Sequence, residues 1–378
     1  MTALERRATG CLAGAAVGDA LGGATEGWSP EQIRERHGGP VTGIAPPFLP
    51  DWRTARPASP YHKGDGHVTD DTLMTNLLVK VYAAKRDHLD AYDIAERLVP
   101  LLLGEKVYIP EFEAESIPLL RVFLAEKWLV TRLHYGHVDP REAGVGNIVN
   151  CGAAMYVAPV GVANAGYPDR AYAEAVEIAG AHQSSYGREA AAVFAAAVAA
   201  ALSPAATVDS VIGECLRLAK DGTRAAIEAV CDRAASLTDP IADAAALRSV
   251  VEPFDTVGPE YRDPGLGARR PSRLHSIEEL PIALGMLRIA SGDYRSAVLG
   301  AVNYGRDADS IATMAGALSG ALLGLETIPE DWRKQVATAS HLDLEATGRE
   351  MAAVAREIHA KDQARTAAAA SAFAELDQ

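Results

Sequence analysis

The chain has 378 residues, of which 48% are hydrophobic, 23% charged and only 6% aromatic, with a large excess of alanine. This composition predicts a globular protein of closely packed helices and excludes a disordered chain. The net charge of -14, from 36 basic and 50 acidic side chains, argues against a nucleic-acid backbone as the main partner, because that affinity depends on clustered lysine and arginine.

The four cysteines are widely spread and form no C-x-x-C pair, which argues against a zinc cluster and a disulfide framework and favours the reducing cytoplasm. An apolar run follows two arginines near the N-terminus, but Asp19 interrupts it, so a signal peptide is the weaker interpretation. No run of about 18 apolar residues is present, and no membrane span is expected. Since no linker divides the chain, we expect one domain over residues 1–344, with an Ala-rich helix over 345–378 that is part of it or appended to it.

Two segments carry a glycine at every fourth position. They are Gly10, Gly14, Gly18 and Gly22 near the N-terminus, and Gly316, Gly320 and Gly324 near the C-terminus. Residues four apart lie on one face of a helix, and a glycine face lets a second helix approach closely. We therefore expect both helices at the centre of the fold.

Apolar residues with a period near 3.6 predict helices over residues 73–82 and 311–325, and Ala-rich helical segments cover about 170–202 and 206–236. Strand-like alternation is nearly absent, so the predicted fold class is all-α, a single compact multi-helix domain. Two proline-rich irregular segments, 43–68 and 252–275, interrupt the helices. They are interpreted either as ordered loops near a site or as plain surface excursions.

Each of two short acidic motifs opens one of the predicted helices. The first is Thr-Asp-Asp-Thr over residues 69–72, and the second is Asp-Ala-Asp-Ser over residues 307–310. Side chains two apart point to nearly opposite sides of a helix, so Asp307 and Asp309 can converge only at a helix terminus. Carboxylates with a neighbouring hydroxyl suit a pair of hard cations such as Mg²⁺. The alternative is that each motif is only a helix cap.

Other common site patterns are excluded. An EF-hand beginning at Asp307 would need Gly at its sixth position and Glu at its twelfth, where the chain has Ala312 and Leu318. The P-loop, the G-x-S-x-G motif of serine hydrolases and the H-E-x-x-H motif of zincins are absent from the sequence. A metal-dependent hydrolase remains the leading interpretation.

The motifs together resemble the ADP-ribosylglycohydrolases, a family that includes dinitrogenase reductase-activating glycohydrolase and the J1 crystallins. The likeness covers most of the chain. It rests on residues 14–22 (GAAVGDALG) with Glu26, on residues 69–72, on residues 152–155 (GAAM) and on residues 305–311 (GRDADSI). Their order and company make the match specific, although each alone is weak.

The resemblance implies an all-α domain with a binuclear Mg²⁺ centre, with Mn²⁺ as an alternative ion. The implied metal ligands are Thr69, Asp70, Asp71, Asp307, Asp309 and Ser310, and the implied catalytic residues are Glu26, Asp70 and Asp309. Ser310 stands where the family usually has threonine, which keeps the hydroxyl oxygen. In the implied mechanism the ions bind the ribose hydroxyls and water, and a carboxylate assists water attack as the bond at the anomeric carbon breaks.

The resemblance also implies a set of substrate contacts. They are Asn150, Cys151, Gly152, Met155, Tyr156, His182, Tyr304, Gly305 and Arg306. Cys151 takes the place of the family's usual asparagine and Tyr156 that of its arginine, while Arg306 replaces a glycine. Cys151 is interpreted as a buried small residue rather than a nucleophile. For His182, the alternative to a substrate contact is a purely structural role.

One basic cluster precedes the second acidic motif, formed by Arg262, Arg269, Arg270, Arg273 and His275. It is interpreted either as a diphosphate contact or as solvated loop charge. The leading hypothesis is hydrolysis of a ribosyl bond in a small-molecule or protein-linked ADP-ribosyl substrate. The alternatives are a metal-dependent hydrolase of a simpler nucleoside-like N-riboside and a non-catalytic crystallin-like binding protein. The sequence leaves the oligomeric state open.

Overall fold

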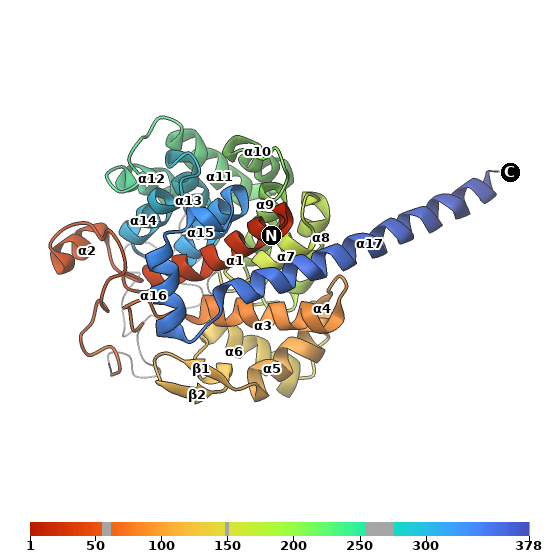
Figure 1. Cartoon of the computed structure of the whole chain (residues 1–378), viewed down its shortest axis with the longest axis horizontal. Coiled ribbons are helices and arrows are strands. Elements are labelled where there is room, and N and C mark those ends of the chain that lie inside the picture. The colour runs from red at the N-terminus through yellow and green to blue at the C-terminus, as the bar shows by residue number, and fades with distance from the viewer. Residues whose placement is uncertain (55–61, 148–150, 255–275, 378) are drawn as a thin grey trace.

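The computed structural model describes residues 1–54, 62–147, 151–254 and 276–377, and its fold is all-α, as predicted (Figure 1). The first helices are α1 (Ala3–Gly22), α2 (Pro30–His37), α3 (Asp70–Lys85), α4 (Ala91–Asp93), α5 (Val99–Gly104), α6 (Leu124–Val130), α7 (Ala158–Ala163), α8 (Pro168–Gly180) and α9 (Tyr186–Ala201). The remaining helices are α10 (Val208–Leu218), α11 (Asp221–Ala234), α12 (Ala244–Val251), α13 (Ser276–Ile289), α14 (Tyr294–Tyr304), α15 (Ala308–Leu323), α16 (Glu330–Ser340) and α17 (Leu344–Leu376).

Helices α1 and α15 pack against each other along their glycine faces, which agrees with the predicted close approach of a second helix, although the sequence did not identify the partner. A Cβ atom built on Gly10 would lie 2.5 Å from the carbonyl oxygen of Gly320, and one built on Gly22 would collide with the backbone of Ala308. The order of these contacts shows that the two helices run antiparallel. The end of α1 therefore lies beside the start of α15, where the second acidic motif begins.

Both acidic motifs sit at helix starts. Thr69 precedes α3 and its hydroxyl accepts a hydrogen bond from the Asp71 N–H at 3.3 Å, so this motif does cap its helix. Asp307 precedes α15 but makes no side-chain capping bond. Helix capping therefore explains the position of Thr69. It does not explain the Asp307 carboxylate, which makes no capping hydrogen bond.

Two Ala-rich segments expected to be helical are each divided into two helices. Between α8 and α9, Asn147 donates a hydrogen bond to the His182 carbonyl at 2.8 Å, and the Ala153 N–H donates to the Gln183 side chain at 2.8 Å. These long-range bonds replace helical ones, and Ser185 adopts a positive φ of 59°, which interrupts the helical path. Between α10 and α11 the Lys220 N–H likewise donates to Glu189 at 2.8 Å.

The described residues also include a short antiparallel hairpin, which the sequence did not predict. Strand β1 (Val107–Ile109) pairs with strand β2 (Ala114–Ser116), so that Tyr108 lies opposite Glu115. With three residues in each strand, the hairpin is too short to show a clear alternation of apolar and polar residues. It leaves the all-α class unchanged.

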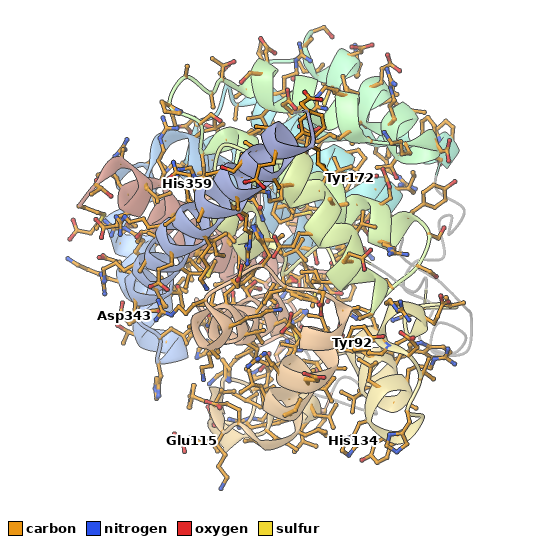
Figure 2. All side chains as sticks on the ribbon, turned by 90° about the vertical axis from the view of Figure 1, so that its right-hand side faces the viewer. Tyr92, Glu115, His134, Tyr172, Asp343 and His359 are labelled. Carbon is orange, nitrogen blue, oxygen red and sulfur yellow. The ribbon has the colours of Figure 1, made fainter. Side chains whose placement is uncertain are left out.

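Helix α17 has two different halves. Its first half is packed on the body through residues such as Met351 and Ile358, whereas every side chain from Gln363 to Asp377 is exposed. Figure 1 shows the second half extending away from the other helices, and Figure 2 looks at the molecule from that side, with His359 labelled on α17. Among the described residues, no helix combines the length and apolar character that a membrane crossing requires.

Candidate metal centre

The fold brings the two acidic motifs together. The Ser310 hydroxyl donates to Asp71 Oδ1 at 3.2 Å, which joins the start of α15 to the start of α3. One carboxylate oxygen each from Asp19, Asp71 and Asp309 lies within 4.8 Å of the other two, and all three residues are buried. Three of the six predicted ligands, Asp71, Asp309 and Ser310, therefore meet at a single place.

The carboxylates of this cluster disfavour one another's charge. Burial raises the pKa of Asp71 well above its usual range, and the charges of Asp19, Asp70 and Asp307 raise it further. Burial raises the pKa of Asp309 in the same way, with added repulsion from Asp71. Burial also raises the pKa of Asp307, to about 6. Bound cations would remove this repulsion, which is the ordinary reason for gathering carboxylates.

Asp19, in the last turn of the glycine-striped helix α1, supports the first motif. Its Oδ2 atom accepts hydrogen bonds from the N–H groups of Thr69 and Thr72, at 3.0 and 3.1 Å, and from the Thr72 hydroxyl. Its Oδ1 atom is buried and has no hydrogen-bond partner among the described residues. The residues present thus fit a hard divalent cation: the donors are oxygens, and one of them is buried without a partner.

Asp70 has a different environment from Asp71. Arg121 donates to Asp70 Oδ1 at 2.9 Å, and the Phe123 N–H donates to Asp70 Oδ2 at 3.2 Å. Arg121 also lies 2.8 Å from Glu111. Burial alone would lower the pKa of the Arg121 guanidinium, but the charges of Glu111 and Asp70 outweigh it and raise the pKa. A permanent cation therefore already neutralises part of this acidic region.

Glu26, one of the predicted catalytic residues, contacts the cluster through a histidine. His62 Nε2 lies 3.0 Å from Glu26 Oε2 and 3.3 Å from Asp309 Oδ2. The other ring nitrogen of His62, Nδ1, lies 2.9 Å from Arg121. His62 comes from the irregular segment 43–68, so the interpretation of this segment as a loop near the site is supported for its described end.

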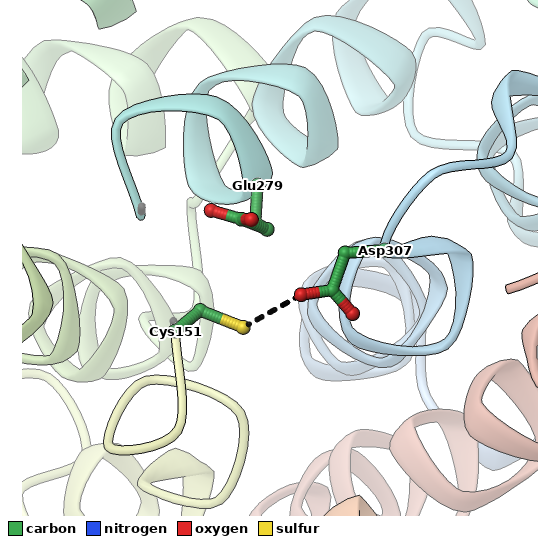
Figure 3. Close-up of side chains that lie close together, drawn as sticks. All are labelled: Cys151, Glu279 and Asp307. Atoms are coloured by element: carbon green, nitrogen blue, oxygen red, sulfur yellow. Dashed lines mark hydrogen bonds between the residues drawn. The ribbon is translucent and has the colours of Figure 1, made fainter. Parts of the chain in front are cut away.

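A second group lies on the other side of Asp307. Ligand atoms of Cys151, Glu279 and Asp307 all lie within 4.8 Å of one another, and the Cys151 thiol is 3.5 Å from Asp307 Oδ2 (Figure 3). Cys151 is buried, as predicted, and burial with the charges of Asp307 and Glu279 raises the pKa of its thiol. A thiol held in this form is a poor nucleophile.

Tyr156 and His182, two predicted substrate contacts, form an interior network. The Tyr156 hydroxyl lies 3.1 Å from His182 Nδ1, and His182 Nε2 lies 3.3 Å from Glu126. All three side chains are fully buried. This is the arrangement expected of a structural histidine, and a substrate contact at Tyr156 or His182 stays a prediction. Gly152 and Met155 are buried beside them.

The predicted contacts at the start of the second motif are held by Glu278. The Tyr304 hydroxyl donates to Glu278 Oε1 at 2.7 Å, and Arg306 Nε lies 2.7 Å from the same oxygen. Gly305 adopts a positive φ of 71° with the Trp28 carbonyl where a Cβ would be, so only glycine fits there. Asn150 and the cluster Arg262, Arg269, Arg270, Arg273 and His275 lie outside the described residues.

Four residues of this region were not assigned a role from sequence. They are Asp19, His62, Arg121 and Glu279. Asp19 had a signal, because an acid inside an apolar glycine-striped helix needs a buried partner. The other three stand in segments without a motif, and they reach the site only through contacts made by the tertiary fold.

Comparisons with known proteins identify relatives over most of the chain. The family described as ADP-ribosylglycohydrolase matches residues 1–368. An uncharacterized protein of Archaeoglobus fulgidus is 30% identical over 355 residues, which are 91% of this chain and 96% of the relative. The ADP-ribosylhydrolase ARH3 of Gallus gallus is 25% identical over 339 residues, which are 87% of this chain and 88% of that protein.

A solved structure, an ADP-ribosylglycohydrolase-related protein complex, has the same fold. The two superpose with a TM-score of 0.61 at 21% identity, over 94% of this chain and 100% of the other. With a match that runs through both acidic motifs and nearly the whole length, the chain belongs to the ADP-ribosylglycohydrolase family, whose members are hydrolases that cleave ribosyl glycosidic bonds.

Proposed function

We propose that this protein hydrolyses the glycosidic bond between an ADP-ribosyl group and its acceptor, in a protein-linked or small-molecule substrate, and that it needs two Mg²⁺ ions for this activity. The observation that carries the proposal is the meeting of Asp71 with Asp309 and Ser310 at the starts of α3 and α15. Related names point the same way, since the Gallus gallus relative is an ADP-ribosylhydrolase. Mn²⁺ offers a second oxygen-preferring ion for the same ligands.

In this proposal Thr69, Asp70, Asp71, Asp307, Asp309 and Ser310 hold the two ions. When bound, the ions supply Lewis-acid and template effects for the ribose hydroxyls and the attacking water. Asp70 and Asp309 would be among the ligands that hold these ions, and Asp70 would exchange one contact with Arg121 for the metal. The Arg121 contact with His62 remains, and it keeps His62 against Glu26.

Glu26 is the proposed base. Its side chain is 14% exposed and that of Asp309 only 7%, so the Glu26 carboxylate is the better placed to meet solvent or substrate. It accepts a proton from the water that attacks the anomeric carbon, while the bond to the acceptor breaks through an oxocarbenium-like state. His62 Nε2 lies 3.0 Å from the Glu26 carboxylate and positions it.

The experiment measures release of ADP-ribose from an ADP-ribosylated protein with Mg²⁺, with Mn²⁺ and after removal of divalent ions by a chelator. Loss of a ligand in Asp71→Asn or Asp309→Asn is expected to lower turnover by more than about a hundredfold, because metal catalysis supplies several kcal/mol. The matched control is Asp343→Asn at the N-cap of α17, where the amide oxygen can still accept the capping hydrogen bonds and only an exposed ion pair with Arg349 is lost. Full turnover in the chelated protein, or in both variants, would refute the metal mechanism.

A simpler N-riboside is the second candidate substrate. It is favoured by Tyr156, which stands where the family has arginine and offers its hydroxyl to His182 rather than a charge to a diphosphate. Thermal protection separates the two candidates in the presence of Mg²⁺. Protection by free ADP-ribose supports the leading candidate, whereas protection by a simple riboside alone supports the second.

Two further predictions remain part of this proposal. We infer that the protein works in the cytoplasm, which agrees with four free, buried cysteines. We also infer that residues 345–378 belong to the same domain as residues 1–344, because the first half of α17 packs on the body through buried residues such as Met351.

A further inference from the structure

The cluster of Cys151, Glu279 and Asp307 combines a sulfur atom with two carboxylates from three separate parts of the chain. Cys151 lies before α7, Glu279 is in the first turn of α13, and Asp307 precedes α15. Figure 3 shows the three side chains grouped together, with the Cys151 thiol directed at Asp307. The cluster adjoins the proposed Mg²⁺ ligands but contains a donor of a different kind.

Glu279 is the residue whose environment indicates a ligand. It is fully buried, and neither of its carboxylate oxygens has a hydrogen-bond partner among the described residues. Its neighbour Glu278 differs, since Tyr304, Arg248 and Arg306 all lie within 2.9 Å of Glu278 Oε1. A buried carboxylate without partners is costly, and binding a cation is one way in which proteins offset that cost.

We propose that Cys151, Glu279 and Asp307 bind a divalent cation of the Zn²⁺ class, at a position that shares Asp307 with the proposed Mg²⁺ pair. A thiolate selects zinc-like ions over Mg²⁺, which prefers oxygen alone. The proposal draws on the proposed function only through the shared Asp307, and the thiolate site stands without it. Under this proposal Cys151, at a position where the resemblance implies an asparagine, is a metal ligand.

The spacing suits such an ion. With Zn–S near 2.3 Å and Zn–O near 2.1 Å, two ligands of a tetrahedral site lie about 3.6 Å apart. The observed Cys151 Sγ to Asp307 Oδ2 distance is 3.5 Å. Three protein ligands leave a fourth position for water or a substrate group, as in catalytic zinc sites. Binding converts the Cys151 thiol to a thiolate and releases its proton to solvent.

The test uses Co²⁺, which reports a thiolate ligand by a sulfur-to-metal charge-transfer absorption that carboxylates lack. The full-length protein, first stripped of metal, is titrated with Co²⁺ and then with Zn²⁺ as competitor. We expect one Co²⁺ with this absorption in the wild type, its displacement by Zn²⁺, and its absence in Cys151→Ser and Cys151→Asn. The matched control is Cys215→Ser, another fully buried cysteine, which keeps the absorption.

Glu279→Gln provides a second measurement if the Cys151 variants do not fold. It keeps the shape of the side chain and the thiolate, so the absorption at saturation persists while the Co²⁺ affinity falls by more than about tenfold. The proposal is overturned if the wild type shows no thiolate absorption, if that absorption survives in Cys151→Asn, or if Glu279→Gln binds Co²⁺ as tightly as the wild type. Release of ADP-ribose with Mg²⁺ is measured separately. Failure of the proposed function would abolish that release and leave the Co²⁺ absorption unchanged, whereas failure of the thiolate site would remove the absorption alone.

Discussion

The Ser310 hydroxyl lies 3.2 Å from Asp71 Oδ1, although the two residues are 239 positions apart in the chain. This contact holds the starts of two helices against each other, with the carboxylates of both motifs between them. Helix starts carry unpaired N–H groups and a partial positive charge, which favour the ionised form of the carboxylates. Burial opposes the ionised form and raises the pKa of Asp71, Asp307 and Asp309, so burial outweighs the helix starts in the metal-free cluster.

The glycine face of α1 predicts an unusual response to alanine. Alanine normally stabilises a helix relative to glycine by about 1 kcal/mol. In Gly10→Ala the new Cβ would lie 2.5 Å from the Gly320 carbonyl oxygen, so we expect the variant to lose about 1–3 kcal/mol of unfolding free energy instead. Urea unfolding measures the change.

The control for this prediction is Gly213→Ala in α10. Gly213 is exposed, and a Cβ built there meets no atom within 4 Å, so alanine should stabilise the protein by about 0.5–1 kcal/mol. The close helix contact would be disproved if both variants shifted stability in the same direction.

Arg121 is predicted to be essential for the stability of the metal-free protein. It is buried between Asp70 and Glu111, and Arg121→Met would leave both carboxylates without their cation. Removing one member of a buried ion pair costs about 3–5 kcal/mol. Chemical unfolding in the presence of a chelator should show this loss, and added Mg²⁺ should restore part of it, because Asp70 is then free to bind metal.

Arg217→Met serves as the comparison. Arg217 pairs with Asp169 and Glu214 at the surface, and exposed pairs contribute at most about 1 kcal/mol. Equal losses in the two variants would show that Arg121 has no special role.

The metal-free protein should become less stable as the pH rises. Burial raises the pKa of Asp307 from 3.8 to about 6, so between these values the folded state holds more protons at this group than the unfolded state. The contribution of Asp307 to stability is therefore greatest in acid and decreases as the pH passes through this window. Bound Mg²⁺ removes the penalty.

The measurement is the shift of Tm on addition of Mg²⁺, recorded at about pH 5 and about pH 7. We expect the larger shift at about pH 7, where the metal-free cluster carries more negative charge. A shift that is the same at both pH values, or larger in acid, is inconsistent with a cation held by these carboxylates.

The outer half of α17 should be dispensable for folding. Residues 366–377 have no buried side chain, so deleting residues 366–378 is expected to change the unfolding free energy by less than about 0.5 kcal/mol. Met351→Ala in the packed half should cost about 2–5 kcal/mol, because Met351 is fully buried. A large loss on deletion would reveal contacts made by this half of the helix.

The sequence predicted those parts of the structure that carry a regular residue spacing or a motif at a helix start. The glycine spacing identified α1 and α15 as central helices with closely approached faces, and the two acidic motifs identified the starts of α3 and α15. The break after α8 could not be predicted from alanine content, because it depends on hydrogen bonds to His182 and Gln183 from a distant segment. The roles of Arg121 and Glu279 could not be predicted for the same reason, because nothing in their neighbouring residues indicates what they contact.

The glycine contact between α1 and α15 links the geometry of the acidic motifs to the packing of the fold. Where Gly22 meets Ala308, backbone rests on backbone, so no side-chain substitution can adjust the distance between the acidic ends of these helices without separating them. Any change in that distance would have to open the glycine contact along its length, from Gly22 to Gly10. The spacing of the two acidic motifs is therefore set by the packing that also holds the centre of the fold together.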